Sequence, residues 1–311
     1  MKTALLFPGQ GSQRVGMGRD LAIRYEAARR VYEEADDALG FAISKLCWEG
    51  PEDDLTLTMH TQPAILTTSI AVLRAIESEQ PLPFDLVAGH SLGEWTALVA
   101  AGALRLADAV RLTHLRGKLM QEAVPVGVGG MAALMGLDAA AVRGVCAEAS
   151  APGEPVEAAN FNGAGQIVIS GHAAAVERAM AAAKAAGAKR AVALTVSAPF
   201  HCSLMQPAAD GMARALADVT VAAPRVPVVT NVEATANDDP ARVKDLLIRQ
   251  ITAPVRWEES VQVLDVAGVT CALELGSGAV LRGLVKRIAP SIEVTTIGEP
   301  HEVEGFVKGG T

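Results

Sequence analysis

Short apolar runs alternate along the chain with longer amphipathic segments, a pattern typical of strands that are each followed by a helix. Strands of the main pattern are predicted at 3–7, 84–88, 226–229, 272–275 and 294–297. Helices with an apolar face are predicted at 20–39, 62–77, 93–101 and 106–123. Elements in this alternation form a mostly parallel sheet with helices on its faces. We therefore predict a large α/β-hydrolase-like domain.

The middle of the chain follows a different order. After a glycine-rich stretch at 126–130, strands are predicted at 131–136, 156–160, 166–171 and 189–196, with helices at 138–149 and 173–186. The order β-α-β-β-α-β is that of a ferredoxin-like unit. We predict that this subdomain, residues 127–197, is inserted into the α/β domain, which then comprises 1–126 and 198–311.

The most informative motif is Gly89-His90-Ser91-Leu92-Gly93, which lies between a predicted strand and a predicted helix. This arrangement is typical of a nucleophile elbow, a turn so tight that only glycine fits on either side of the serine. The turn presents the Ser91 hydroxyl at a helix N-terminus, where backbone N–H groups and the helix dipole stabilise negative charge. Ser91 is therefore the predicted nucleophile.

A glycine-rich loop, Pro8-Gly9-Gln10-Gly11-Ser12-Gln13, follows the first predicted strand. Its glycines lack the Gly-X-Gly-X-X-Gly spacing of dinucleotide sites, and no Gly-Lys-Ser/Thr closes it, so we do not expect a nucleotide site. Two interpretations remain open. The loop is either a plain tight turn or a segment that brings a backbone N–H near Gln10 to the nucleophile, as half of an oxyanion hole.

A serine nucleophile requires a base at neutral pH, and the candidates are the six histidines. His201 is preferred because it follows Pro199-Phe200 just after a predicted strand, where side chains commonly face a cleft. His90 adjoins Ser91, but neighbouring side chains on a sharp turn diverge, so we expect it to pack within the turn. Structural or surface positions are expected for His60, His114, His172 and His301. No acidic residue stands out as a third triad member, which leaves a backbone carbonyl to orient the imidazole.

Composition narrows the classes of function. The formal net charge is −8 over 311 residues, which argues against nucleic-acid binding because that function needs a basic surface. No apolar run reaches the roughly 18 residues of a membrane span, so we expect a soluble, cytoplasmic chain with no membrane partner. Four scattered cysteines suggest neither a zinc site nor a disulfide framework.

Two arginines on the helix predicted at 106–123 are candidates for binding a substrate carboxylate, because a guanidinium donates two parallel hydrogen bonds. They are Arg111 and Arg116. On sequence alone the two are equal candidates, and a solvated position on the helix surface is the commoner case for either.

Several motifs occur together and in order along nearly the whole chain. They are Phe7-Pro8-Gly9-Gln10-Gly11-Ser12-Gln13, Gly89-His90-Ser91-Leu92-Gly93-Glu94, the helix with Arg116, Asn160-Phe161-Asn162, Pro199-Phe200-His201, and Gln250 ahead of Pro254-Val255-Arg256-Trp257. In this combination the chain closely resembles the malonyl-CoA:acyl carrier protein transacylases. The resemblance also implies an inserted ferredoxin-like unit.

The resemblance implies a role for individual residues. Ser91 is the acylated nucleophile, and His201 is its general base, oriented by the main-chain carbonyl of Gln250. Backbone N–H groups of Gln10 and Leu92 form the oxyanion hole. The remaining implied positions bind the substrate: Arg116 at the malonyl carboxylate, with Phe200, Asn160 and Asn162.

The implied reaction is a ping-pong transfer for fatty-acid synthesis. Malonyl passes from malonyl-CoA to Ser91 and then to the phosphopantetheine thiol of holo acyl carrier protein. No metal is implied, nor any cofactor beyond the substrate CoA, and we expect a monomer. Two alternatives remain open: a discrete trans-acting acyltransferase of a polyketide or polyunsaturated-lipid synthase, and an acyl-thioester serine hydrolase.

Overall fold

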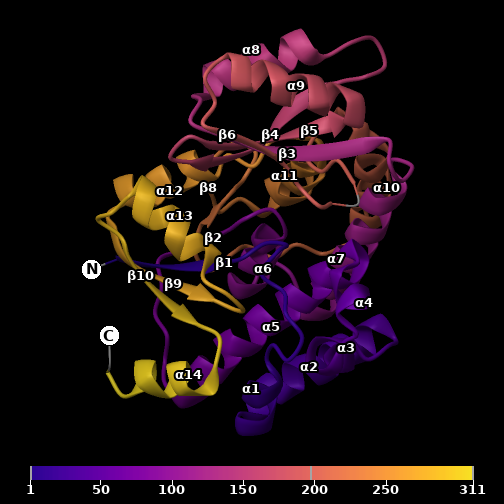
Figure 1. Cartoon of the computed structure of the whole chain (residues 1–311). Coiled ribbons are helices and arrows are strands. Elements are labelled where there is room, and N and C mark those ends of the chain that lie inside the picture. Colours follow the sequence, from indigo (N-terminus) through magenta and orange to yellow (C-terminus); the bar gives the residue numbers. More distant parts are fainter. Residues whose placement is uncertain (1, 197, 310–311) are drawn as a thin grey trace.

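The computed structural model describes residues 2–196 and 198–309, whose strands form two separate sheets (Figure 1). Sheet A consists of β1 (Lys2–Phe7), β2 (Leu86–Gly89), β7 (Val228–Val229), β8 (Ala236–Asn237), β9 (Val269–Leu275) and β10 (Glu293–Ile297). Its order is β10-β9-β1-β2-β7-β8. Neighbouring strands are parallel except for β7 and β8, so the prediction of a mostly parallel sheet is confirmed.

Alternate residues of β1 face different cores, because successive side chains of a strand point to opposite faces. Leu5 and Phe7 lie in a core formed with α2 (Glu26–Leu39), α5 (Thr58–Glu79), α6 (Leu92–Ala100) and α7 (Leu106–Glu122). Ala4 and Leu6 lie in a second core, with α12 (Trp257–Val266) and α13 (Val280–Ile288). Both faces of sheet A are therefore covered, as a parallel sheet requires.

Sheet B is antiparallel and consists of β3 (Gly129–Met135), β4 (Val156–Gly163), β5 (Gln166–His172) and β6 (Arg190–Ala193), in the order β4-β5-β3-β6. One face packs on α8 (Ala139–Ala149) and α9 (Ala173–Ala185), which lie at the top of Figure 1. The other face packs on Phe200 and Val196. The chain order of these elements is the predicted one. Ser197, the predicted last residue of the inserted subdomain, lies outside the described residues, and the division into domains stays a prediction.

The remaining helices pack mainly against other helices. They are α1 (Arg19–Arg24), α3 (Ile43–Glu49), α4 (Glu52–Thr56), α10 (Gln206–Leu216), α11 (Pro240–Thr252) and α14 (Pro300–Val307), with a 3₁₀ turn at Ser203–Met205. Within residues 2–196 and 198–309, no helix combines the length and the apolar run that crossing a membrane would need.

Most predicted elements differ from the structure at their ends, and two of the differences change the fold or the site. The single helix predicted at 20–39 is wrong: Tyr25 has extended backbone angles, φ −119° and ψ 117°, and separates α1 from α2. Buried positions continue at helical spacing through the break, at Leu21, Tyr25 and Ala28, so the spacing does not reveal it. The strand predicted at 189–196 ends at Ala193, and the residues after it line a cavity described below.

The backbone of Phe7 lies so close to Gly93 that a side chain at this position should lower stability. A Cβ there would lie 2.0 Å from the carbonyl oxygen of Phe7. We expect Gly93→Ala to lower the free energy of unfolding by about 1–3 kcal/mol through overpacking. Gly144, inside α8, is the matched control, since a Cβ there meets nothing within 4 Å and alanine is favoured in helices by roughly 0.5–1 kcal/mol. Thermal denaturation should give a lower Tm for the first variant only; equal shifts would contradict the close approach.

Candidate active site

Ser91 lies between β2 and α6, with φ 51° and ψ −104°. On either side of it the backbone folds back tightly, since a Cβ on Gly89 would lie 2.0 Å from the carbonyl carbon and oxygen of Gly93. The tight turn expected from the motif is therefore present. A positive φ at a residue other than glycine costs on the order of 1–3 kcal/mol, and such residues cluster at functional sites.

The buried side chain of Asn231 holds this turn. Its Oδ1 accepts a hydrogen bond from the backbone N–H of Ser91 at 2.7 Å, and its Nδ2 donates to the carbonyl of Gly89 at 2.8 Å. The sequence analysis missed Asn231. A signal was available, because Asn231 follows a strand predicted to belong to the same sheet, at the carboxyl edge where Ser91 was also expected.

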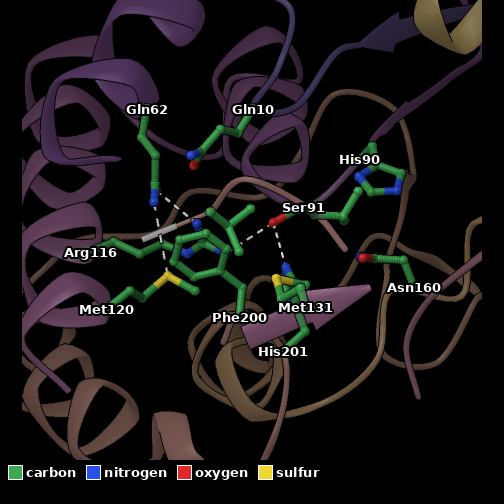
Figure 2. Close-up of a pocket in the computed structure, with 12 residues that line it drawn as sticks. Gln10, Gln62, His90, Ser91, Arg116, Met120, Met131, Asn160, Phe200 and His201 are labelled. Carbon is green, nitrogen blue, oxygen red and sulfur yellow. Dashed lines mark hydrogen bonds between the residues drawn. The ribbon is translucent and has the colours of Figure 1, made fainter. Parts of the chain in front are cut away.

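Ser91 and His201 are 110 residues apart in the sequence, and the fold brings them together. Ser91 Oγ lies 2.7 Å from His201 Nε2 (Figure 2). On the other side of the ring, His201 Nδ1 donates to the main-chain carbonyl of Gln250 at 2.8 Å. Burial, and after it the positive charge of Arg116, lowers the pKa of His201 to about 3. The imidazole is therefore neutral at physiological pH, with its proton on Nδ1 and Nε2 free to accept the serine proton.

Arg116 is buried beside the nucleophile. Its Nη2 donates to Ser91 Oγ at 3.2 Å and to Gln250 Oε1 at 2.9 Å, and its Nη1 donates to Gln62 Oε1 at 2.7 Å. Burial lowers its pKa to about 10, which leaves the guanidinium charged at neutral pH. Arg111, the alternative on the same helix, has a side chain 51% exposed and pairs with Asp108. The structure therefore separates the two candidates, and it adds Gln62, which sequence reasoning did not identify as a site residue.

These side chains surround a cavity of about 140 Å³ between the two sheets. Figure 2 shows Gln62 and Gln10 on one side of it, with Met131 and His201 on the other. Its apolar wall is formed by Met120, Met131, Leu194, Val196 and Phe200. A charged group at one side of a mostly apolar wall suits a small acyl group that ends in an anion.

The other predicted site residues occupy different positions. Gln10 lines the cavity, and its loop touches the turn, since a Cβ on Gly9 would lie 2.6 Å from the carbonyl oxygen of His90. Leu92 is the first residue of α6, so its N–H has no acceptor within the helix. Asn160 lines the cavity as well. Asn162, predicted to bind substrate, is not among the lining residues; its Oδ1 accepts from His90 Nε2 at 2.9 Å instead.

Glu94 is a buried carboxylate that the sequence analysis quoted in a motif but assigned no role. Its Oε2 accepts from the side-chain Nε2 of Gln250 at 2.6 Å and from the backbone N–H of Asn231 at 3.0 Å. Burial raises the pKa of Glu94 to about 7, and its hydrogen bonds and Arg116 oppose that shift. The position of Glu94, three residues after Ser91 and the sole charged residue of α6, was the available signal.

Of the remaining histidines, only His90 lines the cavity; His60, His114, His172 and His301 lie outside its wall. The rings of His60 and His114 stack at a centroid distance of 5.9 Å, and each Nδ1 bonds to a backbone carbonyl. His172 precedes α9, and His301 is exposed on α14. His90 packs against the ring of Trp257 at 5.6 Å and also reaches the cavity.

Comparison with known proteins agrees with this geometry. The acyl transferase domain family matches residues 4–289. The malonyl CoA-acyl carrier protein transacylase of Salmonella typhimurium is 50% identical over 297 residues, which cover 96% of this chain and 96% of that protein. This chain belongs to the malonyl CoA-acyl carrier protein transacylase family. The resemblance inferred from the motifs is confirmed.

Solved transacylase structures share the two-sheet α/β architecture. The acyl-carrier-protein-S-malonyltransferase of Bartonella henselae has a TM-score of 0.96 and 48% identity, covering 99% of both chains. A malonyl-transacylase in complex with a type II PKS acyl-carrier protein has a TM-score of 0.95 and 43% identity, covering 99% of this chain and 100% of that one.

The low pKa of His201 generates a prediction. We expect its imidazole to be neutral at pH 5, where an unperturbed histidine is mostly protonated, because its pKa is about 3. A lowered pKa keeps the base form as the pH falls, so heteronuclear NMR of the ring nitrogens should show the Nδ1–H tautomer, assigned by loss of the signal in His201→Gln. In Arg116→Ala the pKa should rise. If His201 in the unsubstituted protein titrates with a midpoint near that of a free histidine, the result would contradict the geometry.

Proposed function

We propose that this chain transfers malonyl from malonyl-CoA to the phosphopantetheine thiol of acyl carrier protein, for fatty-acid synthesis, through a malonyl-Ser91 intermediate. The observation that carries the proposal is the Ser91–His201 pair, with the guanidinium of Arg116 only 3.2 Å from the same oxygen. The base and the guanidinium that can bind the carboxylate therefore both lie within hydrogen-bond distance of the nucleophile, Ser91 Oγ.

In the first half-reaction, Ser91 Oγ attacks the thioester carbonyl of malonyl-CoA while His201 Nε2 takes its proton. The tetrahedral oxyanion lies near the N–H groups of Gln10 and Leu92, and one well-placed donor of this kind contributes roughly 3 kcal/mol. The carbon–sulfur bond then breaks, and His201 gives its proton to the departing CoA sulfur, so that CoA leaves as the thiol and the imidazole is neutral again.

In the second half-reaction the thiol of the carrier protein attacks the malonyl group, and the steps occur in the reverse order. After CoA departs, His201 takes the proton of the carrier thiol, and the sulfur attacks the malonyl ester. The ester bond breaks, and Ser91 regains its proton from His201. Because the chain supplies the nucleophile, the base and the oxyanion donors, the cycle as proposed requires no metal and no cofactor beyond substrate CoA.

Arg116 selects the acyl group in this proposal. Its Nη2 now contacts the Ser91 hydroxyl, and a malonyl carboxylate can take two hydrogen bonds from a guanidinium in that position. An acetyl group would leave the buried charge without a new partner, which a site built for a carboxylate disfavours.

Three finer assignments accompany this function. We infer that sheet B with α8 and α9 is a ferredoxin-like unit, supported by the strand order β4-β5-β3-β6. The cytoplasmic location and the monomeric state remain predictions. A hydrolase would use the same serine and histidine, but membership of a transacylase family favours transfer to a thiol over transfer to water.

Intact-protein mass spectrometry tests the proposal. We expect malonyl-CoA to add one malonyl group to the protein and holo acyl carrier protein to remove it, with malonyl-carrier as the product. Ser91→Ala should show no adduct. An adduct that decays to free malonate in the presence of the carrier would indicate a hydrolase, and the absence of any adduct on the unsubstituted protein would refute the role of Ser91.

Arg116→Ala tests the selection of the acyl group. We expect malonyl transfer to fall on the order of 100-fold, because a charge-assisted bidentate contact is lost, while acetyl transfer is unchanged or rises. Arg111→Ala is the matched control, since its side chain is 51% exposed on the same helix. An equal loss for both acyl groups in a two-substrate assay would contradict the assignment.

A further inference from the structure

Arg116 is a fully buried guanidinium whose hydrogen-bond acceptors are neutral. They belong to Gln62, Gln250 and Ser91. Among residues 2–196 and 198–309, none places a carboxylate within ion-pair distance of Arg116. Burying a charge without a counter-charge is costly. A carboxylate that compensates the charge of Arg116 therefore has to lie beyond its direct hydrogen-bond partners.

This carboxylate belongs to Glu94, and the side-chain amide of Gln250 lies between it and Arg116. Gln250 Oε1 accepts from Arg116 at 2.9 Å, while Gln250 Nε2 donates to Glu94 Oε2 at 2.6 Å. Glu94 is 1% exposed, as is Arg116. Two buried opposite charges separated by a single polarised amide attract each other strongly, because little water screens them.

We propose that Glu94 is the charge partner of Arg116, and that through Gln250 it weakens the hold of Arg116 on the malonyl carboxylate so that malonyl can leave Ser91 for the carrier. This inference rests on the proposed function. Glu94 does not line the cavity, so it acts on the substrate through Gln250 and Arg116 as a positioning residue.

The sign of the effect follows from the charges. With Glu94 ionised, the Arg116–Glu94 pair is neutral, and an incoming malonyl carboxylate makes the site negative. Without that charge the site begins positive and becomes neutral, so malonyl binds more tightly. Binding that stabilises the malonyl-enzyme more than the following transition state slows the second half-reaction. An acetyl group carries no charge and should not respond.

Glu94→Gln isolates the charge. A glutamine there keeps an oxygen that can accept from Gln250 Nε2 and the Asn231 N–H, as Oε2 does now. Glu274→Gln is the matched control: Glu274 is also 1% exposed, but its carboxylate accepts from the N–H groups of Leu281 and Arg282 at the start of α13. Glu94→Asp retains the charge and changes the contacts, so it separates charge from packing.

The measurements are KM for malonyl-CoA and acetyl-CoA and the single-turnover rate constant for transfer of each acyl group from Ser91 to holo acyl carrier protein. They are made well above pH 7, where Glu94 is ionised. For Glu94→Gln we expect a KM for malonyl-CoA about tenfold lower and a malonyl transfer rate about tenfold lower, with acetyl values within about twofold. Glu94→Asp and Glu274→Gln should keep the malonyl-to-acetyl ratio of the unsubstituted protein.

The malonyl-to-acetyl ratio and the single-turnover rate constants do not depend on the fraction of protein that is folded. A variant that is merely less stable therefore does not give the result expected for Glu94→Gln. Equal changes for malonyl and acetyl in Glu94→Gln, or no change, would overturn the inference and leave Glu94 a structural residue. The inference would also be overturned if Glu94→Asp changed the malonyl-to-acetyl ratio as much as Glu94→Gln does. If the unsubstituted protein forms no malonyl-Ser91, the proposed function itself is wrong, and the inference falls with it.

Discussion

The backbone of Ser91, held at φ 51°, is the constraint on which the site depends. Contact between Gly89 and Gly93 permits the turn, and Asn231 fixes it from both sides of the serine. Because Asn231 occupies the N–H of Ser91, that donor is not available to an oxyanion. In the proposed function the donors are those of the next residue, Leu92, and of the glycine-rich loop, and the close approach of Gly9 to the turn supports that proposal.

Burial gives Arg116 two effects on the chemistry. Its charge, together with desolvation, keeps His201 neutral and therefore ready to accept a proton. In the proposed function the same charge binds the malonyl carboxylate. A carboxylate placed on His201 Nδ1, as in a Ser-His-Asp triad, would favour the protonated imidazole and repel the malonyl anion. The main-chain carbonyl of Gln250 orients the ring without either consequence, and the nearby acid, Glu94, stands one amide farther away.

The sequence predicted those parts of the site that depend on local structure. Glycines at fixed offsets from Ser91 specify a turn, and His201 could be chosen because it follows a predicted strand. The hydrogen bonds of Arg116 could not be predicted, because Gln62 and Gln250 reach it from distant segments that meet only when the chain packs. The break at Tyr25 was hidden for a related reason: buried positions keep helical spacing through it, so tertiary packing sets the boundary. Asn162 does not line the cavity, since its amide oxygen bonds to His90 instead, and its role in substrate binding stays a prediction.

Phe200 connects the two sheets and therefore links the shape of the cavity to the position of the base. Its side chain packs against the large core beneath sheet A and also against the cluster on the inner face of sheet B. It lines the cavity with Met131 of β3, and its neighbour His201 has a positive φ of 59°. A residue held in that conformation cannot turn freely to compensate for a shifted neighbour. The shape of the cavity at Phe200 and the alignment of His201 with Ser91 are consequently set by the same packing between the sheets, so a substitution that changes one will also change the other.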